Sequence, residues 1–399
     1  MIKRHISTQI DRLKKGFPVL AITGPRQSGK TTLIKEIFSD YEYLNLENPE
    51  ILALVENDPA GFMRSHKNKV IIDEVQRVPQ LFSYIQTIVD EQKVMGNFII
   101  SGSENLLLSE KINQSLAGRA AYIHLYPLSH KELVEAEKDK KDVYQQIFTG
   151  SYPAIYDRKV TPIDYYNQYL ATYVERDMKQ LSNIANLSLF RKFLALLAGR
   201  TGQLVNLSSL ANDVGVSVAT IENWISLLEA SFLVIRLQPY HQNYGKRHIK
   251  SPKLYFTDTG VACRLLGISS AQELQKHYLI GGLFENFIIM EIKKHIANHI
   301  SSSQLYFFRD SNGNEVDVII DSGLKQIPVE IKVGGTFSQD FTKGIEYWQN
   351  LTMTKEDDSF EPGFVVYTGQ QKHEGKNYSL LQWNALDALF EKIALDTAG

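Results

Sequence analysis

The stretch that most limits how this chain can fold is GPRQSGKT, residues 24–31. It follows an apolar run at 17–23, which predicts a buried strand, and it precedes the helical pattern TTLIKEIF. Strand, glycine-rich loop and helix in this order predict a P-loop, whose backbone N–H groups surround phosphate. We expect the loop and the start of the helix to contact ATP through Gly24, Pro25, Arg26, Gln27, Ser28, Gly29, Lys30, Thr31 and Thr32.

A second element distinguishes hydrolysis from simple phosphate binding. Within the loop, Lys30 is expected to reach the β- and γ-phosphates, and Thr31 to ligate Mg²⁺. The apolar strand in KVIIDEVQ, residues 69–76, ends in Asp73 and Glu74. We expect Asp73 to hold Mg²⁺ through water and Glu74 to polarise an attacking water. A nucleoside kinase needs no such water-activating carboxylate, so the pair favours an ATPase.

Polar residues after the next strands are candidates for sensing the nucleotide. The strand predicted at 97–103 ends in Ser101 and Ser103, which lie where a γ-phosphate sensor is expected, although serine is also common in turns. Arg119 stands just before a fifth predicted strand, AAYIHLY at 120–126. In ring-forming ATPases this corner faces the neighbouring subunit's nucleotide, where an arginine stabilises transition-state charge. An ordinary surface arginine is the alternative.

Several motifs together resemble a known family. GPRQSGKTTL, VIIDEVQ, IISGS, LAGRA and LYPLSHKEL occur in this order, and GSYPAIYD, YLATYVERDMKQL, SPKLYFTDTG and GGLFENFIIMEI extend the likeness over nearly the whole chain. They resemble the AAA-type ATPases of a large bacterial and archaeal family whose C-terminal region is of unknown function. The resemblance implies ATP and Mg²⁺ as ligands and a homo-oligomeric ring.

The middle of the chain alternates helical patterns with short turns. Residues 130–186 suit a helical lid, in which Arg176 is either a nucleotide sensor or part of an ion pair. Residues 206–240 predict a helix, a turn at Gly215, a second helix and a strand, the order of a winged helix. The second helix carries Glu222 and Glu229 and no basic residue, which argues against reading DNA bases. The basic wing at 246–253 predicts either phosphate binding or a solvated loop.

A second acidic site is predicted near the C-terminus. In NEVDVII and PVEIK the side chains alternate, so Asp317, Glu330 and Lys332 converge if the two strands pair as a hairpin. This pattern resembles the core of restriction-endonuclease-like nucleases, in which carboxylates bind a divalent metal and the lysine assists the chemistry. Glu285, on an apolar helical stripe upstream, is expected to add a third carboxylate. A solvated acidic face is the alternative.

These observations give an α/β protein of several domains. We expect a P-loop AAA-type ATPase core at 1–129, a helical lid at 130–186, a winged helix at 187–260 and an α/β restriction-endonuclease-like domain at 261–399. The net charge of −2 gives no global sign of nucleic-acid binding, so such binding would need a local patch. One cysteine and the lack of a long apolar run favour a cytoplasmic location and no membrane contact. The function is either an ATPase with a tethered nuclease or an ATP-dependent switch whose C-terminal domain binds without cleaving.

Overall fold

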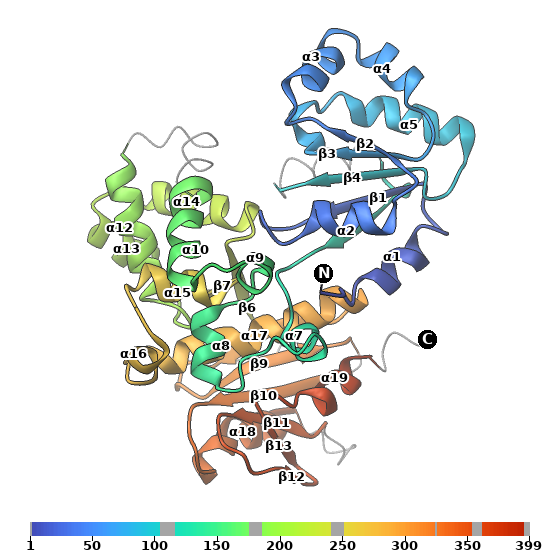
Figure 1. Ribbon diagram of the computed structural model, residues 1–399. Helices are drawn as coiled ribbons and strands as arrows, with labels where there is room; N and C mark the ends of the chain where they lie inside the picture. Colours follow the sequence, from blue (N-terminus) through green and yellow to red (C-terminus); the bar gives the residue numbers. More distant parts are fainter. Residues whose placement is uncertain are drawn as a thin grey trace.

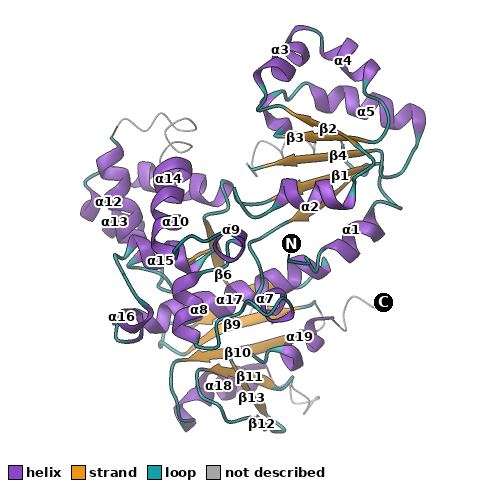
Figure 2. Cartoon of the chain, in the orientation of Figure 1, coloured by secondary structure: helices purple, strands orange, loops and turns teal. Residues whose placement is uncertain are grey.

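The computed structural model describes residues 2–103, 116–174, 186–240, 251–323, 325–352 and 361–394. Figure 1 shows an N-terminal α/β region in blue and cyan, a group of helices in green, and a C-terminal α/β region in orange and red. Two separate sheets are visible in Figure 2. Among the described residues, no helix is both long enough and apolar enough to cross a membrane.

The N-terminal sheet is parallel, with the strand order β2-β3-β4-β1-β5. Its strands are β1 (Val19–Thr23), β2 (Glu42–Asn45), β3 (Val70–Asp73), β4 (Phe98–Gly102) and β5 (Ala120–His124). The accompanying helices are α1 (Ser7–Leu13), α2 (Lys30–Ile37), α3 (Pro49–Asn57), α4 (Pro59–Ser65), the 3₁₀ turn η1 (Val75–Arg77) and α5 (Leu81–Gln92). The strands predicted around β1, β3, β4 and β5 are confirmed, whereas the short β2 had no clear signal.

Both faces of this sheet are covered by apolar side chains. Val19, Ile72 and Ile100 pack on one face, and Leu20, Ile22 and Ile99 pack on the other, so the central strands β1, β3 and β4 are buried on both sides. Continuous apolar strands are the pattern expected for a parallel sheet between helical layers. Because the strands are parallel, their carboxyl ends meet at one edge, where ligands bind in open α/β sheets.

The helical region follows the first sheet. It contains α7 (His130–Glu135), α8 (Val143–Thr149), α9 (Pro153–Asp157), α10 (Pro162–Tyr169), the π-helical turn η2 (Leu170–Val174), α12 (Leu187–Ala198), α13 (Leu207–Val214), α14 (Val218–Ala230), α15 (Thr259–Leu265) and α16 (Ala271–Gln275). Gly215, with φ of 92°, ends α13 in the left-handed region and makes the predicted turn before α14. Arg176 lies outside the described residues.

The second sheet has eight strands in the order β12-β13-β11-β10-β9-β8-β6-β7. Its elements are β6 (Val234–Pro239), β7 (Lys253–Phe256), α17 (Ile280–His299), β8 (Gln304–Arg309), β9 (Glu315–Asp321), β10 (Gln326–Lys332), the 3₁₀ turn η3 (Gln339–Thr342), α18 (Lys343–Thr352), β11 (Gly363–Tyr367), β12 (His373–Glu374), β13 (Tyr378–Gln382) and α19 (Asp387–Ala394). The β6–β7 hairpin, expected as a wing, pairs with β8 and so belongs to this sheet. The expected boundary at 260/261 therefore runs through one sheet.

The β9–β10 pairing is antiparallel, as predicted, with Val329 opposite Val318. A bulge in the β8–β9 ladder interrupts the expected alternation on β9. As a result Val316 packs under α18, in a cluster with Trp348, whereas Val318 and Ile320 face the core that contains α17. The helix α17 lies between the two sheets and contacts both β5 and β10.

Candidate functional site

The P-loop connects β1 to α2 in a conformation that needs glycine at two points. Gly24 and Gly29 have φ of 152° and 96°, and a Cβ atom on Gly24 would lie 2.2 Å from the carbonyl oxygen of Leu125. A pocket of about 350 Å³ opens over the loop. It is lined by the predicted residues Arg26, Gln27, Gly29, Lys30, Thr31, Thr32 and Glu74, together with Glu47, Pro153, Ala154, Asp157 and Arg158.

Lys30 is folded onto the loop itself. Its ammonium donates to the carbonyl oxygens of Gly24 at 2.9 Å and Pro25 at 3.0 Å. Burial lowers the pKa of Lys30 to about 8, against the opposing attraction of Glu74 and Asp73. A bound phosphate would give the Lys30 ammonium a full counter-charge, which the two carbonyl oxygens do not. We therefore expect Lys30 to leave these carbonyls when a nucleotide binds.

Asp73, at the end of β3, meets three hydroxyl groups. Its Oδ2 accepts from Thr31 Oγ1 at 2.8 Å and from the Tyr43 hydroxyl at 2.6 Å, and its Oδ1 accepts from Ser101. All three donors are neutral, so none of them supplies a counter-charge to the carboxylate. A hydroxyl and a carboxylate side by side are hard oxygen ligands, and Mg²⁺ commonly binds through one or two such groups plus substrate phosphates. Thr31 and Asp73 thus fit the expected metal.

Glu74 begins the turn after β3, with φ of 57°. Its Oε2 accepts from the Ser103 hydroxyl at 3.2 Å and from Gln76 Nε2 at 2.5 Å. Asp73 and Ser101 are register partners on adjacent parallel strands. Asp73 is therefore held by a serine of β4, and Glu74 by the serine that directly follows this strand.

Arg119 precedes β5 at the molecular surface. Its guanidinium pairs with Asp90 of α5, with Nε 2.5 Å from Oδ1 and Nη2 3.0 Å from Oδ2. Within one chain it lies outside the residues that line the P-loop pocket.

Two contributors to this pocket were not predicted from the sequence. The helix α9 covers the loop, and its Pro153 approaches Gly29, while Arg158 at the end of α9 adds a cation to the pocket wall. Arg4 donates to the Ser28 carbonyl at 2.9 Å, the Tyr126 carbonyl at 2.7 Å and Glu132 at 3.1 Å. An isolated arginine near the N-terminus gives no sequence signal for such a role, because its contacts with Tyr126 and Glu132 each span more than a hundred residues.

Buried polar contacts continue from this point to α17. Glu132 belongs to the capping box of α7, and the next contact runs from the His130 backbone N–H to Glu291 on α17 at 2.7 Å. Glu291 in turn accepts from Lys294 at 2.8 Å, and Lys294 also donates to the Leu128 carbonyl at 2.9 Å. The P-loop is thereby connected to the helix that reaches the second sheet.

The C-terminal residues lie where β9 and β10 separate. Asp317 Oδ2 accepts from the Ile331 backbone N–H at 2.8 Å and from Lys332 Nζ at 2.9 Å. Lys332 also pairs with Glu330. Repulsion from Asp317 adds to burial in raising the pKa of Glu330, while the attraction of Lys332 and Lys253 outweighs burial and lowers that of Asp317. The predicted convergence of these three residues is present.

Glu285 does not complete a quartet on one face. Val329 and Ile331 pack toward α17, so Glu330 points to the opposite face, where a Cβ atom on Gly344 of α18 would lie 1.8 Å from its Oε1. Glu285 comes from α17 instead and accepts from Lys253 at 3.0 Å and from the Tyr255 hydroxyl at 2.5 Å.

Lysine neutralises the carboxylates of this cluster. Lys253 is 3% exposed, and it also pairs with Glu315 at 2.6 Å. Burial opposes the charge on Lys253, but the attraction of Glu285, Asp317 and Glu315 raises its pKa. Within the described residues, no group of three or more acidic, histidine or cysteine side chains is arranged to hold a metal ion.

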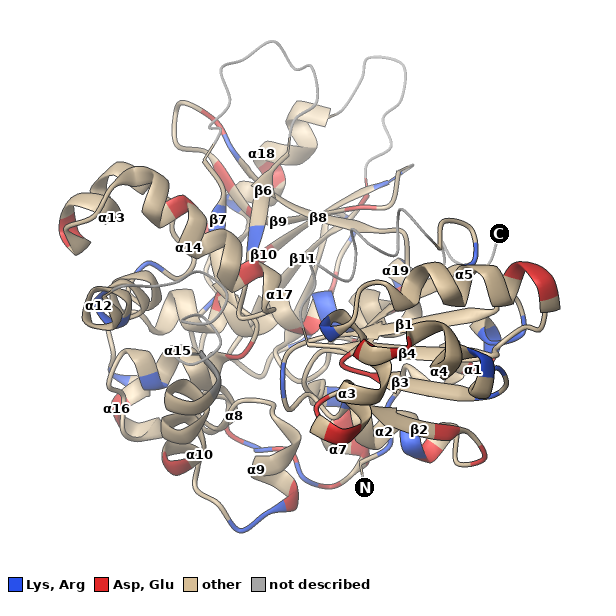
Figure 3. Ribbon diagram, turned by 90° about the horizontal axis from the view of Figure 1, so that it is seen from above, with Lys and Arg blue, Asp and Glu red and all other residues tan. Residues whose placement is uncertain are grey.

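The acidic residues of α14, the helix expected to be the second one of a winged helix, form ion pairs with the second sheet. Glu222 and Glu229 on α14 pair with Arg236 of β6 at 2.6 and 2.7 Å. Of the basic residues in the wing at 246–253, Lys253 lies in the cluster described above, and Lys246, Arg247 and Lys250 lie outside the described residues. Figure 3 shows charges of both signs interspersed over the ribbon.

Comparisons with known proteins agree with the N-terminal geometry. The family described as "AAA domain" matches residues 16–134. Two families described as domains of unknown function, DUF8612 and DUF4143, match residues 140–272 and 280–386.

Similar proteins occur in bacteria and archaea. An uncharacterized protein of Mycobacterium tuberculosis is 28% identical over 334 residues, covering 83% of this chain and 74% of that protein. One from Methanocaldococcus jannaschii is 24% identical over 340 residues, covering 77% and 73%. Among solved structures, the Walker-type ATPase PABY2304 of Pyrococcus abyssi is 13% identical with a TM-score of 0.43, covering 66% of this chain and 96% of that one. Residues 16–134 are thus similar to AAA-type P-loop domains, and they are followed by two regions that match families of unknown function.

Proposed function

We propose that this chain binds ATP with Mg²⁺ at the P-loop and hydrolyses it, with Glu74 orienting and activating the attacking water. The observation that carries the proposal is the pair of carboxylates at the end of β3. Asp73 contacts Thr31 at 2.8 Å, and Glu74, one residue on, is held separately by Ser103. One carboxylate is thus available for the metal and the other for water.

The roles of the individual residues follow from their contacts. Lys30 leaves the Gly24 and Pro25 carbonyls and pairs with the phosphates, while the loop N–H groups surround them. Thr31 and Asp73 would hold Mg²⁺, which when bound offsets negative charge on the phosphate oxygens. Ser101 and Ser103 keep the two carboxylates in place from the neighbouring strand.

Steady-state ATP hydrolysis by the full chain tests this proposal. Glu74→Gln should bind ATP like the wild type and hydrolyse it about 10²- to 10³-fold more slowly, the scale for loss of one catalytic polar group. Glu56→Gln, an exposed carboxylate on α3, is the matched control and should keep the wild-type rate. Hydrolysis at the wild-type rate by Glu74→Gln would show that another group activates water.

The nucleotide state is proposed to be transmitted to the C-terminal region. The contacts from Ser28 through Arg4 and Glu132, and from His130 through Glu291, give a buried connection between the P-loop and α17. A buried polar group that loses its partner is costly, so we expect these contacts to rearrange together and not singly. This supports an ATP-dependent switch whose C-terminal domain binds a partner without cleaving it.

Assembly into a ring is proposed from the position of Arg119. Arg119 lies on the surface, and its ion pair with the exposed Asp90 contributes little energy. Arg119 can therefore leave Asp90 and contact the nucleotide of a neighbouring subunit. Arg119→Ala should then bind ATP normally and hydrolyse it slowly, and adding Lys30→Ala subunits should partly restore the rate. A strictly monomeric chain with full activity in sedimentation and ATPase assays contradicts the ring.

Metal-dependent cleavage of nucleic acid is a second candidate, favoured by the convergence of Asp317, Glu330 and Lys332. It requires a divalent metal to compete with Lys332 and Lys253 for the carboxylates. Incubation of the full chain with DNA and RNA, with Mg²⁺ or Mn²⁺, tests it. Cleavage by the wild type that disappears in Asp317→Asn would establish a nuclease. Intact substrates would favour the switch whose C-terminal domain binds a partner without cleaving it.

A further inference from the structure

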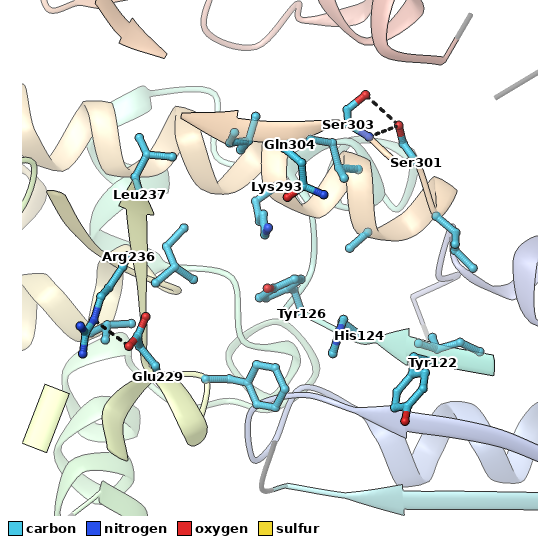
Figure 4. A pocket seen from close by; sticks show the side chains of 18 residues that line it. Tyr122, His124, Tyr126, Glu229, Arg236, Leu237, Lys293, Ser301, Ser303 and Gln304 are labelled. Carbon is cyan, nitrogen blue, oxygen red and sulfur yellow. Dashed lines mark hydrogen bonds and ion pairs between the residues drawn. The ribbon is translucent and has the colours of Figure 1, made fainter. Parts of the chain in front are cut away.

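A cavity of about 420 Å³ lies between the first sheet, the β6 strand and α17 (Figure 4). Its walls include Tyr122 and His124 of β5, Tyr126, Phe232, and Lys293 of α17. It shares no lining residue with the P-loop pocket. The volume is within the range of small-molecule sites, roughly 300–1,000 Å³.

Lys293 differs from its neighbour on the same helix. Lys294 is buried and fully partnered, with Glu291, the Leu128 carbonyl and Ser151 all within 3.1 Å. Lys293 points into the cavity (Figure 4), and in the described part of the chain no carboxylate pairs with it. Burial lowers the pKa of Lys293. A partly buried cation without a counter-charge is costly, and an anion in the cavity would relieve that cost.

The other charged groups on the cavity wall are already compensated. Arg236 pairs with Glu229 at 2.7 Å and with Glu222 at 2.6 Å, so its positive charge is already compensated. His124 shares a hydrogen bond with Thr23 at 2.8 Å, and burial together with the nearby Lys293 lowers its pKa. A neutral His124 leaves Lys293 as the uncompensated cation among the described lining residues.

An aromatic surface lies beside this charge. The rings of Tyr126 and Phe232 meet edge to face at 6.4 Å between centroids, and the His124 ring lies 5.7 Å from that of Phe232. Such a surface accepts a flat ring by stacking or edge contacts. We propose that this cavity binds a small organic anion, a ring bearing a carboxylate, phosphate or similar acidic group, with that group paired to Lys293 and the ring against Tyr126 and Phe232.

Fluorescence titration with 8-anilinonaphthalene-1-sulfonate, an aromatic anion, tests the proposal in the full chain. Saturating MgADP is present throughout, so that the P-loop is occupied. Lys293→Met should weaken binding about tenfold or more, since a charge-assisted contact is lost. Lys293→Arg should retain most of the affinity. Lys276→Met, which removes an exposed lysine elsewhere, should change nothing.

A neutral probe separates charge from shape. N-phenyl-1-naphthylamine has the same rings without the sulfonate, and it should bind the wild type and Lys293→Met equally. Lys293→Met should also melt no lower than the wild type, because it replaces an unpaired, partly buried charge with an apolar chain of similar length. Equal affinity of the wild type and Lys293→Met for the anionic probe overturns the proposal, and so does an equal loss for both probes.

Discussion

The P-loop site and the C-terminal cluster contain similar residues in different electrostatic settings. Asp73 is hydrogen-bonded by the hydroxyls of Thr31, Tyr43 and Ser101, which carry no counter-charge. In the C-terminal cluster, Asp317 pairs with Lys332 and Glu285 with Lys253. Neutral donors orient a carboxylate and leave it able to attract a metal ion, whereas a lysine occupies the place that the metal would take. Acidic residues at metal-like spacing are therefore not sufficient evidence of a metal site.

The largest expected effect is on the stability of the C-terminal cluster. Lys253→Met leaves Glu285, 13% exposed, without its cation, and should lower the free energy of unfolding by about 3 kcal/mol, near the lower end of values for breaking a buried pair. The Lys253→Met, Glu285→Gln double variant should recover much of this loss. Urea unfolding of the full chain, followed by tryptophan fluorescence, measures both.

The same variant sharpens the comparison. If the carboxylates can become metal ligands once the lysine is gone, Mg²⁺ or Mn²⁺ should restore the stability of Lys253→Met. An unfolding midpoint equal to that of the wild type, with or without metal, would mean that Lys253 does not neutralise the cluster. Lys276→Met serves as the surface control, with a change within about 0.5 kcal/mol.

A smaller effect is expected from pH at the P-loop. Burial holds the pKa of Lys30 at about 8 in the free protein, below the unfolded value of 10.5. Phosphates should raise it again, so ATP affinity should be high below pH 8 and fall about tenfold between pH 7 and pH 9. Lys30→Arg, which stays charged, should bind more weakly with a flat pH profile. Calorimetric titration measures the ATP affinity, and a flat pH profile of the wild type would contradict the lowered pKa of Lys30.

The same pKa also affects stability. The pKa of Lys30 is lower in the folded protein than in the unfolded one, so the free protein should gain stability as pH rises from about 8 toward 10.5.

Local sequence predicted most of the first site because its parts lie at the ends of adjacent parallel strands. The order strand, loop and helix fixes Lys30 and Thr31, and the same sheet edge brings Asp73 beside Ser101. The position of α9 over the loop and the contacts of Arg4 depend on packing between distant segments, which periodicity does not reveal.

The second site was less predictable for a physical reason. The β9–β10 hairpin and the contact of Asp317 with Lys332 follow from alternation and a short turn. Lys253, predicted as part of a basic wing, enters the cluster only because the β6–β7 hairpin joins the second sheet beside β8. The face on which Glu285 meets this sheet is likewise set by how α17 packs, not by its helical stripe.

The number of Mn²⁺ ions bound per chain tests the central contrast most directly. With a non-hydrolysable ATP analogue present, electron paramagnetic resonance should count one tightly bound Mn²⁺ in the wild type and in Asp317→Asn. Asp73→Asn should lose it, because the hydroxyl-held carboxylate is the proposed metal ligand. Two ions in the wild type, one of which is lost in Asp317→Asn, would contradict the account and establish a metal site in the C-terminal cluster.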